Sequence, residues 1–173
     1  MHWCSVSWKR TMNMIPTVHL DIQNACQASG IPDTSELIEW VSRALAHGKT
    51  QTHKACELTL RIVDTEEITQ LNRNYRDKDG ATNVLSFPFE YPPGIPDDPD
   101  QKILGDILIC APVMQEESLQ QNKSIKAHWA HLVIHGTLHL LGYDHISDTE
   151  AQQMEQLETQ LLADLKFPDP YQQ

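Results

Sequence analysis

The stretch HWAHLVIHGTLHLLGYDH, residues 128–145, decides the fold of this chain and holds five of its nine histidines. Its apolar residues recur at helical spacing, which predicts a helix over residues 127–141. Residues four apart lie on one face of a helix, about 5–6 Å apart at Cβ, so His135 and His139 can point their imidazoles at one metal ion. The sequence therefore predicts a metal site on a largely apolar helix.

The end of this helix supplies the third candidate ligand. Gly142 is the kind of residue that ends a helix in a left-handed conformation, so the chain can turn back and bring His145 to the same ion. Three protein ligands and an open fourth position are typical of a catalytic zinc site. His131, one turn before His135, is the alternative partner. It lies about 12 Å along the helix axis from His139 and cannot join both others, so the glycine turn favours His145.

The same motif argues against one class of zinc enzyme. Zinc peptidases carry HExxH, in which the glutamate is the general base towards the metal-bound water. Gly136 occupies that position here and has no group that takes a proton, and Thr137 beside it has no useful pKa. A single histidine on an apolar helix is most often a core or surface residue. The full spacing HxxxHxxxxxH with its glycine is what indicates a metal-dependent hydrolase.

Composition limits the remaining classes. At 173 residues the chain is expected to form one domain, and its net charge of −11 counts against a broad surface for nucleic acid. The four cysteines lie far apart without a CxxC pair, which argues against a cysteine-based zinc site and suits a reducing cytosol. No apolar run approaches the ~20 residues of a membrane span, and no secretory signal is visible. We therefore expect a cytoplasmic protein without membrane contact.

Regular patterns predict four strands and five helices, and hence an α+β (α/β-like) domain with one mixed sheet packed by helices. Pro88 argues that the third strand lies at an edge of the sheet. Residues 17–170 form the predicted domain, and residues 1–16 are an extension that we expect to be disordered. The predicted strands cover residues 17–22, 58–63, 84–89 and 103–110, and the predicted helices cover 33–46, 64–74, 112–122, 127–141 and 147–165.

Acidic residues gather in the last helix. Residues 147–165 contain no lysine or arginine, and such a run is usually a solvated face. We expect five acidic side chains to face solvent there: Asp148, Glu150, Glu155, Glu158 and Asp164.

The eleven residues HGTLHLLGYDH (135–145) resemble the signature of the YbeY family of bacterial endoribonucleases. The resemblance extends over about residues 17–170, and further segments resemble family segments in family order. These are LRIVD (60–64), NYRDKDGATNVLSFPFE (74–90), LGDILIC (104–110) and AHWAHLVIHGTLHLLGYDH (127–145).

The resemblance implies a single-strand-specific, metal-dependent endoribonuclease that matures the 3′ end of small-subunit ribosomal RNA and takes part in ribosome quality control. It implies one Zn²⁺ per chain on His135, His139 and His145, and a catalytic role for Arg61. The implied partners are ribosomal RNA and the small ribosomal subunit with its proteins, and no DNA. The alternative is a non-catalytic assembly factor in which zinc stabilises the fold.

Basic residues supply candidates for binding the substrate. A guanidinium near the metal can pair with two phosphoryl oxygens, and Arg61 needs a partner in its otherwise apolar strand. From the residues alone, an ion-paired or edge-strand arginine is an equally good interpretation. Arg73, Arg76 and Lys78 are candidates for phosphate contacts, or they belong to a solvated loop.

Two aspartates and the missing base leave the mechanism open. Asp144 either orients a ligand imidazole or caps the turn. Asp106 interrupts an apolar strand and is either a carboxylate satisfied in the core or a group that supports the site. No general base is visible, so our hypothesis is that hydroxide bound to the metal attacks the phosphodiester directly. The competing route uses the RNA's own 2′-hydroxyl as the nucleophile.

Overall fold

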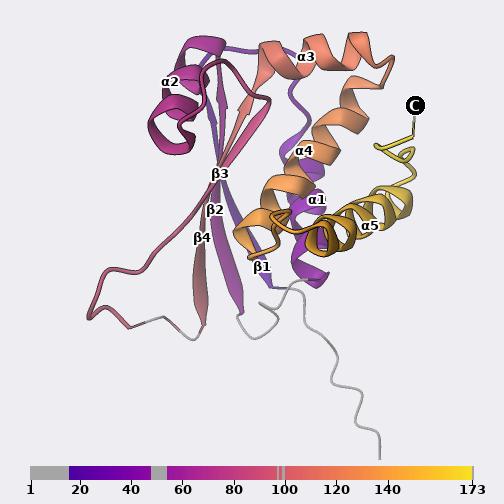
Figure 1. The fold of residues 1–173 in the computed structure, drawn as a ribbon. Helices are drawn as coiled ribbons and strands as arrows, with labels where there is room; N and C mark the ends of the chain where they lie inside the picture. Colours follow the sequence, from indigo (N-terminus) through magenta and orange to yellow (C-terminus); the bar gives the residue numbers. More distant parts are fainter. Residues whose placement is uncertain (1–15, 48–53, 97, 99, 173) are drawn as a thin grey trace, which may run out of the picture.

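The structure is a computed structural model that describes residues 16–47, 54–96, 98 and 100–172 (Figure 1). The predicted N-terminal extension, residues 1–16, lies outside the described residues except for Pro16. Among the described residues, three cysteines are free, and no helix is both long and apolar enough to cross a membrane.

In the part of the chain that the structure describes, one four-stranded sheet forms the centre of the domain, in the order β1-β2-β4-β3. The first three strands in this order run parallel, and β3 pairs antiparallel with β4, so the predicted mixed sheet is confirmed. The strand with Pro88 lies at the edge, where a residue without an N–H costs no ladder hydrogen bond. The strands are β1 (Thr17–Asn24), β2 (Ala55–Val63), β3 (Val84–Pro88) and β4 (Gln101–Cys110).

The five helices of the described residues lie unequally on the two faces of the sheet. Figure 1 shows α2 on one side, and α1, α4 and α5 on the other, where α4 packs against both α1 and α5. This arrangement confirms the predicted α+β domain. The helices are α1 (Thr34–His47), α2 (Thr65–Arg76), α3 (Ala111–Gln120), α4 (Ile125–Leu140) and α5 (Asp148–Asp164).

Alternation along β2 separates the two faces. Leu58, Leu60 and Ile62 are buried in the main core with α1 and α4. Successive side chains of a strand point to opposite faces, so Arg61 lies on the face that α2 covers. Val63 belongs to the smaller core on that face.

Helix α2 is longer than its sequence pattern predicts. It continues through Tyr75 and Arg76, which we expected in a loop, and ends where Asp77 takes a left-handed conformation at φ 52°. Asn72, which is buried, donates from Nδ2 to the carbonyl of Gly80 at 3.0 Å and ties the following loop to the helix. The basic end of α2 is thereby held beside β3.

Candidate metal centre

Helix α4 ends in the left-handed turn that the sequence predicts at Gly142. Gly142 has a φ of 86°, and its N–H donates to the carbonyl of His139 at 3.0 Å. The N–H of Tyr143 donates to the carbonyl of Leu138 at 3.0 Å, which completes a Schellman motif. The chain turns back at this point and brings His145 beside the helix.

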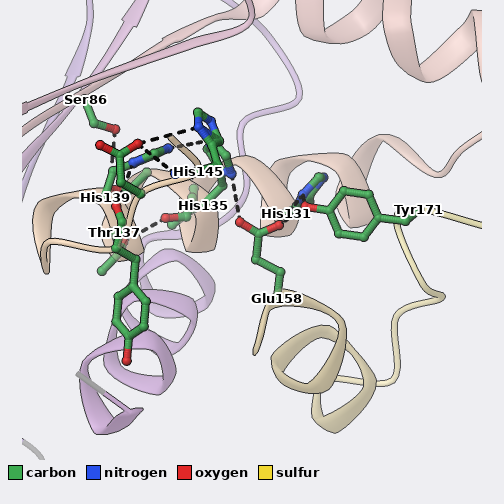
Figure 2. Close-up of polar contacts among 12 residues, drawn as sticks. Ser86, His131, His135, Thr137, His139, His145, Glu158 and Tyr171 are labelled. Atoms are coloured by element: carbon green, nitrogen blue, oxygen red, sulfur yellow. Dashed lines mark hydrogen bonds and ion pairs between the residues drawn. The ribbon is translucent and has the colours of Figure 1, made fainter. Parts of the chain in front are cut away.

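Three imidazoles converge at this turn (Figure 2). One ring nitrogen from each of His135, His139 and His145 lies within 4.8 Å of the other two. The Nε2 atoms of His135 and His139 are 3.1 Å apart. A tetrahedral zinc ion with Zn–N bonds of about 2.0–2.1 Å would hold its nitrogens about 3.3 Å apart. The structure brings the three predicted ligands together, and their binding of a metal stays a prediction.

Hydrogen bonds at the other ring nitrogens show which tautomers are present. Nδ1 of His135 lies 2.8 Å from a Glu158 carboxylate oxygen, and Nδ1 of His139 lies 3.0 Å from the Tyr143 carbonyl. Both oxygens only accept hydrogen bonds, so each Nδ1 carries its proton, and a neutral ring then has its lone pair on Nε2. Two lone pairs that face each other across 3.1 Å fit a cation between them.

The electrostatics of the site favour a neutral imidazole at His139. Burial lowers the pKa of His139 to about 4, and the nearby His135 and His145 add to this shift. A neutral imidazole is the form that binds a metal ion, so this ring needs no deprotonation near neutral pH.

Glu158 is a functional candidate that the sequence analysis missed. We expected it on a solvated acidic face, and this prediction was wrong, because its side chain has no exposed area. It lies four residues after Met154, on the buried stripe of α5, and this spacing is the signal that could have found it. Burial opposes its ionisation, but hydrogen bonds from His131 and His135 outweigh burial and lower its pKa to about 2.

His131 does not join the three converging histidines. Its Nε2 lies 3.1 Å from the second oxygen of Glu158, on the side away from His139 (Figure 2). His131, His135 and Glu158 therefore form a second group whose donor atoms lie close together.

Gly136 lets α4 approach the sheet closely. A Cβ at this position would lie 2.7 Å from Cγ2 of Ile107 and 3.2 Å from Oγ of Ser86. The Ser86 hydroxyl donates to the carbonyl of Gly136 at 3.3 Å. The glutamate of a zinc peptidase would not fit here unless the helix or the Ile107 side chain shifted. Gly136 thus allows close packing of α4 on the sheet, and it also leaves the site without the general base of a zinc peptidase.

A hollow of about 260 Å³ opens beside the three imidazoles, and we call it the histidine hollow. Two of the predicted phosphate-binding residues, Arg76 and Lys78, line it together with the edge of β3. The third, Arg73, points elsewhere and pairs with Asp79 at 2.7 Å on the exposed surface. The residues lining the hollow are Asn72, Arg76, Lys78, Thr82, Asn83, Val84, Leu85, Ser86, His135, His139 and His145.

Arg61 lies in a different hollow, of about 550 Å³, between α2 and the sheet, and we call it the arginine hollow. Its guanidinium donates to both carboxylate oxygens of Glu67, at 2.8 and 3.2 Å, and to Gln23 at 3.0 Å. The edge-strand interpretation is wrong because β2 is an inner strand, whereas the ion pair exists. The catalytic role of Arg61 stays a prediction.

The two aspartates lie near the two hollows. Asp106 lines the arginine hollow and is exposed, so neither placement that we expected, in the core or beside the metal site, holds. Asp144 accepts from the backbone N–H of His145 at 2.8 Å, and the same oxygen lies 3.6 Å from Nδ1 of that ring. It stands where it can orient His145, and it also stabilises the turn.

Comparison with known proteins identifies the family. The family described as Endoribonuclease YbeY matches residues 21–166. The Endoribonuclease YbeY of Alcanivorax borkumensis is 55% identical over 161 residues, which cover 92% of this chain and 90% of that protein. The solution structure of TM1509 from Thermotoga maritima shares 23% identity at a TM-score of 0.49, over 90% of this chain and 100% of that one. By its family match and its 55% identical relative, the chain belongs to the YbeY family of endoribonucleases.

Proposed function

We propose that this protein is a single-strand-specific endoribonuclease that depends on one Zn²⁺ held by His135, His139 and His145. The observation that carries the proposal is the pair of Nε2 lone pairs of His135 and His139, 3.1 Å apart, with a third imidazole beside them. Three nitrogen donors leave one coordination position open, as catalytic zinc sites do.

The surroundings of the site suit a phosphodiester. A zinc ion bound there would supply Lewis-acid activation of a phosphoryl group and of water. Arg76 and Lys78 line the same hollow, and their charges can hold the non-bridging oxygens of a phosphate next to the imidazoles. The chain's own residues would therefore act mainly by binding and orienting the phosphodiester.

We further propose that the substrate is ribosomal RNA, at the 3′ end of the small-subunit RNA, with a role in ribosome quality control. The support is membership of an endoribonuclease family together with the resemblance of the histidine motif. A net charge of −11 disfavours capture of free RNA by electrostatics, so the small ribosomal subunit and its proteins would supply part of the attraction. This substrate implies a cytoplasmic location.

The alternative function is a non-catalytic assembly factor in which zinc stabilises the fold. The acidic net charge supports it, because a nuclease for free RNA would attract phosphates more strongly. A structural zinc is normally closed by four protein ligands, whereas three imidazoles converge here, and this favours the enzyme.

His135→Ala tests the two functions against each other. We expect zinc binding and RNA cleavage to be lost while the far-UV circular dichroism spectrum and cooperative unfolding remain. The matched control is His19→Ala, which removes an exposed histidine of β1. Unfolding of the variant, or of the wild type after chelation, would support a structural ion instead. The ends of the cleaved RNA then identify the nucleophile, because a 2′,3′-cyclic phosphate arises only when the 2′-hydroxyl attacks.

A further inference from the structure

Glu158 joins three parts of the chain that lie apart in sequence. It projects from α5, its carboxylate accepts from His135 of α4 at 2.8 Å and from His131 of α4 at 3.1 Å, and the hydroxyl of Tyr171 donates to it from the C-terminal tail. Figure 2 shows the carboxylate between His135 on one side and His131 with Tyr171 on the other. The tail is thereby connected to a ligand of the proposed zinc site through one carboxylate.

A fully buried carboxylate needs several donors, because removing its charge from water costs several kcal/mol. His131, His135 and Tyr171 supply these donors. Only the bond to His135 affects the proposed metal site directly. A carboxylate on Nδ1–H holds the imidazole in one tautomer and one orientation, and makes Nε2 a stronger ligand.

The tail is held in place by its own contacts. The backbone N–H of Tyr171 donates to Asp169 at 2.9 Å, and Nζ of Lys123 donates to the carbonyl of Pro170. The Tyr171 ring packs edge-on against His131, with the ring centroids 5.6 Å apart. Tyr171 as a whole is 44% exposed, yet its hydroxyl reaches the buried carboxylate. The tail thus closes the outer side of the Glu158 site.

We infer that Glu158 is a positioning residue for the metal site, and that the C-terminal tail, through Tyr171, stabilises the zinc-binding orientation of His135. This inference rests on the proposed zinc site. Binding free energies are reciprocal, so if the docked tail strengthens zinc binding, zinc must equally strengthen the docking of the tail.

A second ion on His131, His135 and Glu158 is the competing interpretation of the same atoms. It requires His135 to ligate through Nδ1 as well, and thus to lose the proton that it shares with Glu158. Both carboxylate oxygens already accept hydrogen bonds, which favours positioning over ligation.

Zinc affinity measured without RNA tests the inference. Apo protein is titrated with Zn²⁺ in competition with a chelator. We expect Glu158→Gln to weaken binding about 10–100-fold, the range for groups that support a metal ligand. Tyr171→Phe keeps the ring and removes one hydrogen bond, so we expect a loss of about 3–10-fold. Gln172→Ala, an exposed change in the same tail, should have no effect.

A core variant and hydrogen exchange separate positioning from general destabilisation. Leu45→Ala removes buried atoms from α1, a helix that supplies no ligand and no lining residue of the histidine hollow, and it should lower stability without changing zinc affinity. Zinc should slow amide exchange in residues 167–172 of the wild type, and less so in Tyr171→Phe.

Three other results would contradict the positioning role of Glu158 or the zinc site itself. Wild-type zinc affinity in both Glu158→Gln and Tyr171→Phe refutes the positioning role alone. Two zinc ions per wild-type chain, with one lost in Glu158→Gln, would make Glu158 a ligand and refute it as well. A wild-type chain that binds no zinc refutes the proposed metal dependence, and the inference with it.

Discussion

The two hollows beside α2 differ in both size and charge, and the smaller one carries the more positive lining. Among the described residues that line the histidine hollow, Arg76 and Lys78 are charged and none is acidic. The arginine hollow is about twice as large, at about 550 against 260 Å³, but Glu67 and Asp106 outnumber its one guanidinium. A phosphodiester is an anion, so the smaller hollow suits it better. Charge and donor geometry, more than volume, identify the site.

In the comparison of the two hollows, the largest effect should come from removing the positive charge of the histidine hollow. We expect the double variant Arg76→Ala with Lys78→Ala to lower kcat/KM for RNA cleavage roughly 100–10,000-fold, since each of the two side chains loses a hydrogen bond to a charged group that contributes about 1.5–3 kcal/mol. Zinc affinity should not change. Arg73→Ala is the matched control, because this residue lies on the same helix but outside the hollow and pairs with Asp79. An equal loss in the control would mean that overall charge, and not the hollow, matters.

A smaller effect is expected from the arginine hollow. Arg61→Ala leaves Glu67 without its ion-pair partner in a hollow that Asp106 also lines, and we expect kcat/KM to fall about tenfold with zinc affinity unchanged. Adding Glu67→Gln separates the two roles of the arginine. Recovery of activity in the double variant would mean that Arg61 only neutralises its hollow. No recovery would support the predicted contact between Arg61 and the RNA.

The smallest effect is a difference in pH dependence between the hollows. The pKa of His139 is lowered to about 4 in the folded protein, so below about pH 6.5 the unfolded chain binds a proton that the folded chain does not. The stability of the metal-free protein should therefore fall as the pH falls from 7.5 to 5, by at most about 2 kcal/mol through this group.

Urea unfolding of metal-free His139→Gln and Arg61→Gln measures this difference. As the pH falls over that range, the free energy of unfolding should decrease more in the wild type than in His139→Gln. Arg61 should make the same contribution to the stability difference between wild type and Arg61→Gln at every pH in this range, because the arginine keeps its charge. A flat gap for His139→Gln would contradict a neutral, buried imidazole.

Local patterns predicted much of the fold because each depends on near neighbours in the chain. The end of α4 is an example, since only a residue tolerant of positive φ suits the position of Gly142. The end of α2 shows the limit. Tyr75 and Arg76 belong to a polar, turn-rich stretch without helical periodicity, yet the helix continues until Asp77 takes the left-handed conformation. Contacts with β3 and the following loop, which lie outside a local pattern, decide that end.

The sequence by itself determined the convergence of the three histidines, because their spacing on a helix and a glycine turn set it locally. Strand alternation and helical periodicity, which are also local, predicted the sheet with its helices, and the histidine motif with the other resembling segments indicated the family. Only the tertiary structure decided that Glu158 is buried against His135, that Arg76 shares the histidine hollow, and that Arg61 lies on the opposite face of the sheet. Those outcomes depend on which elements pack together, and a carboxylate that reads as solvated in its own helix becomes a buried acceptor once α4 and the C-terminal tail close over it.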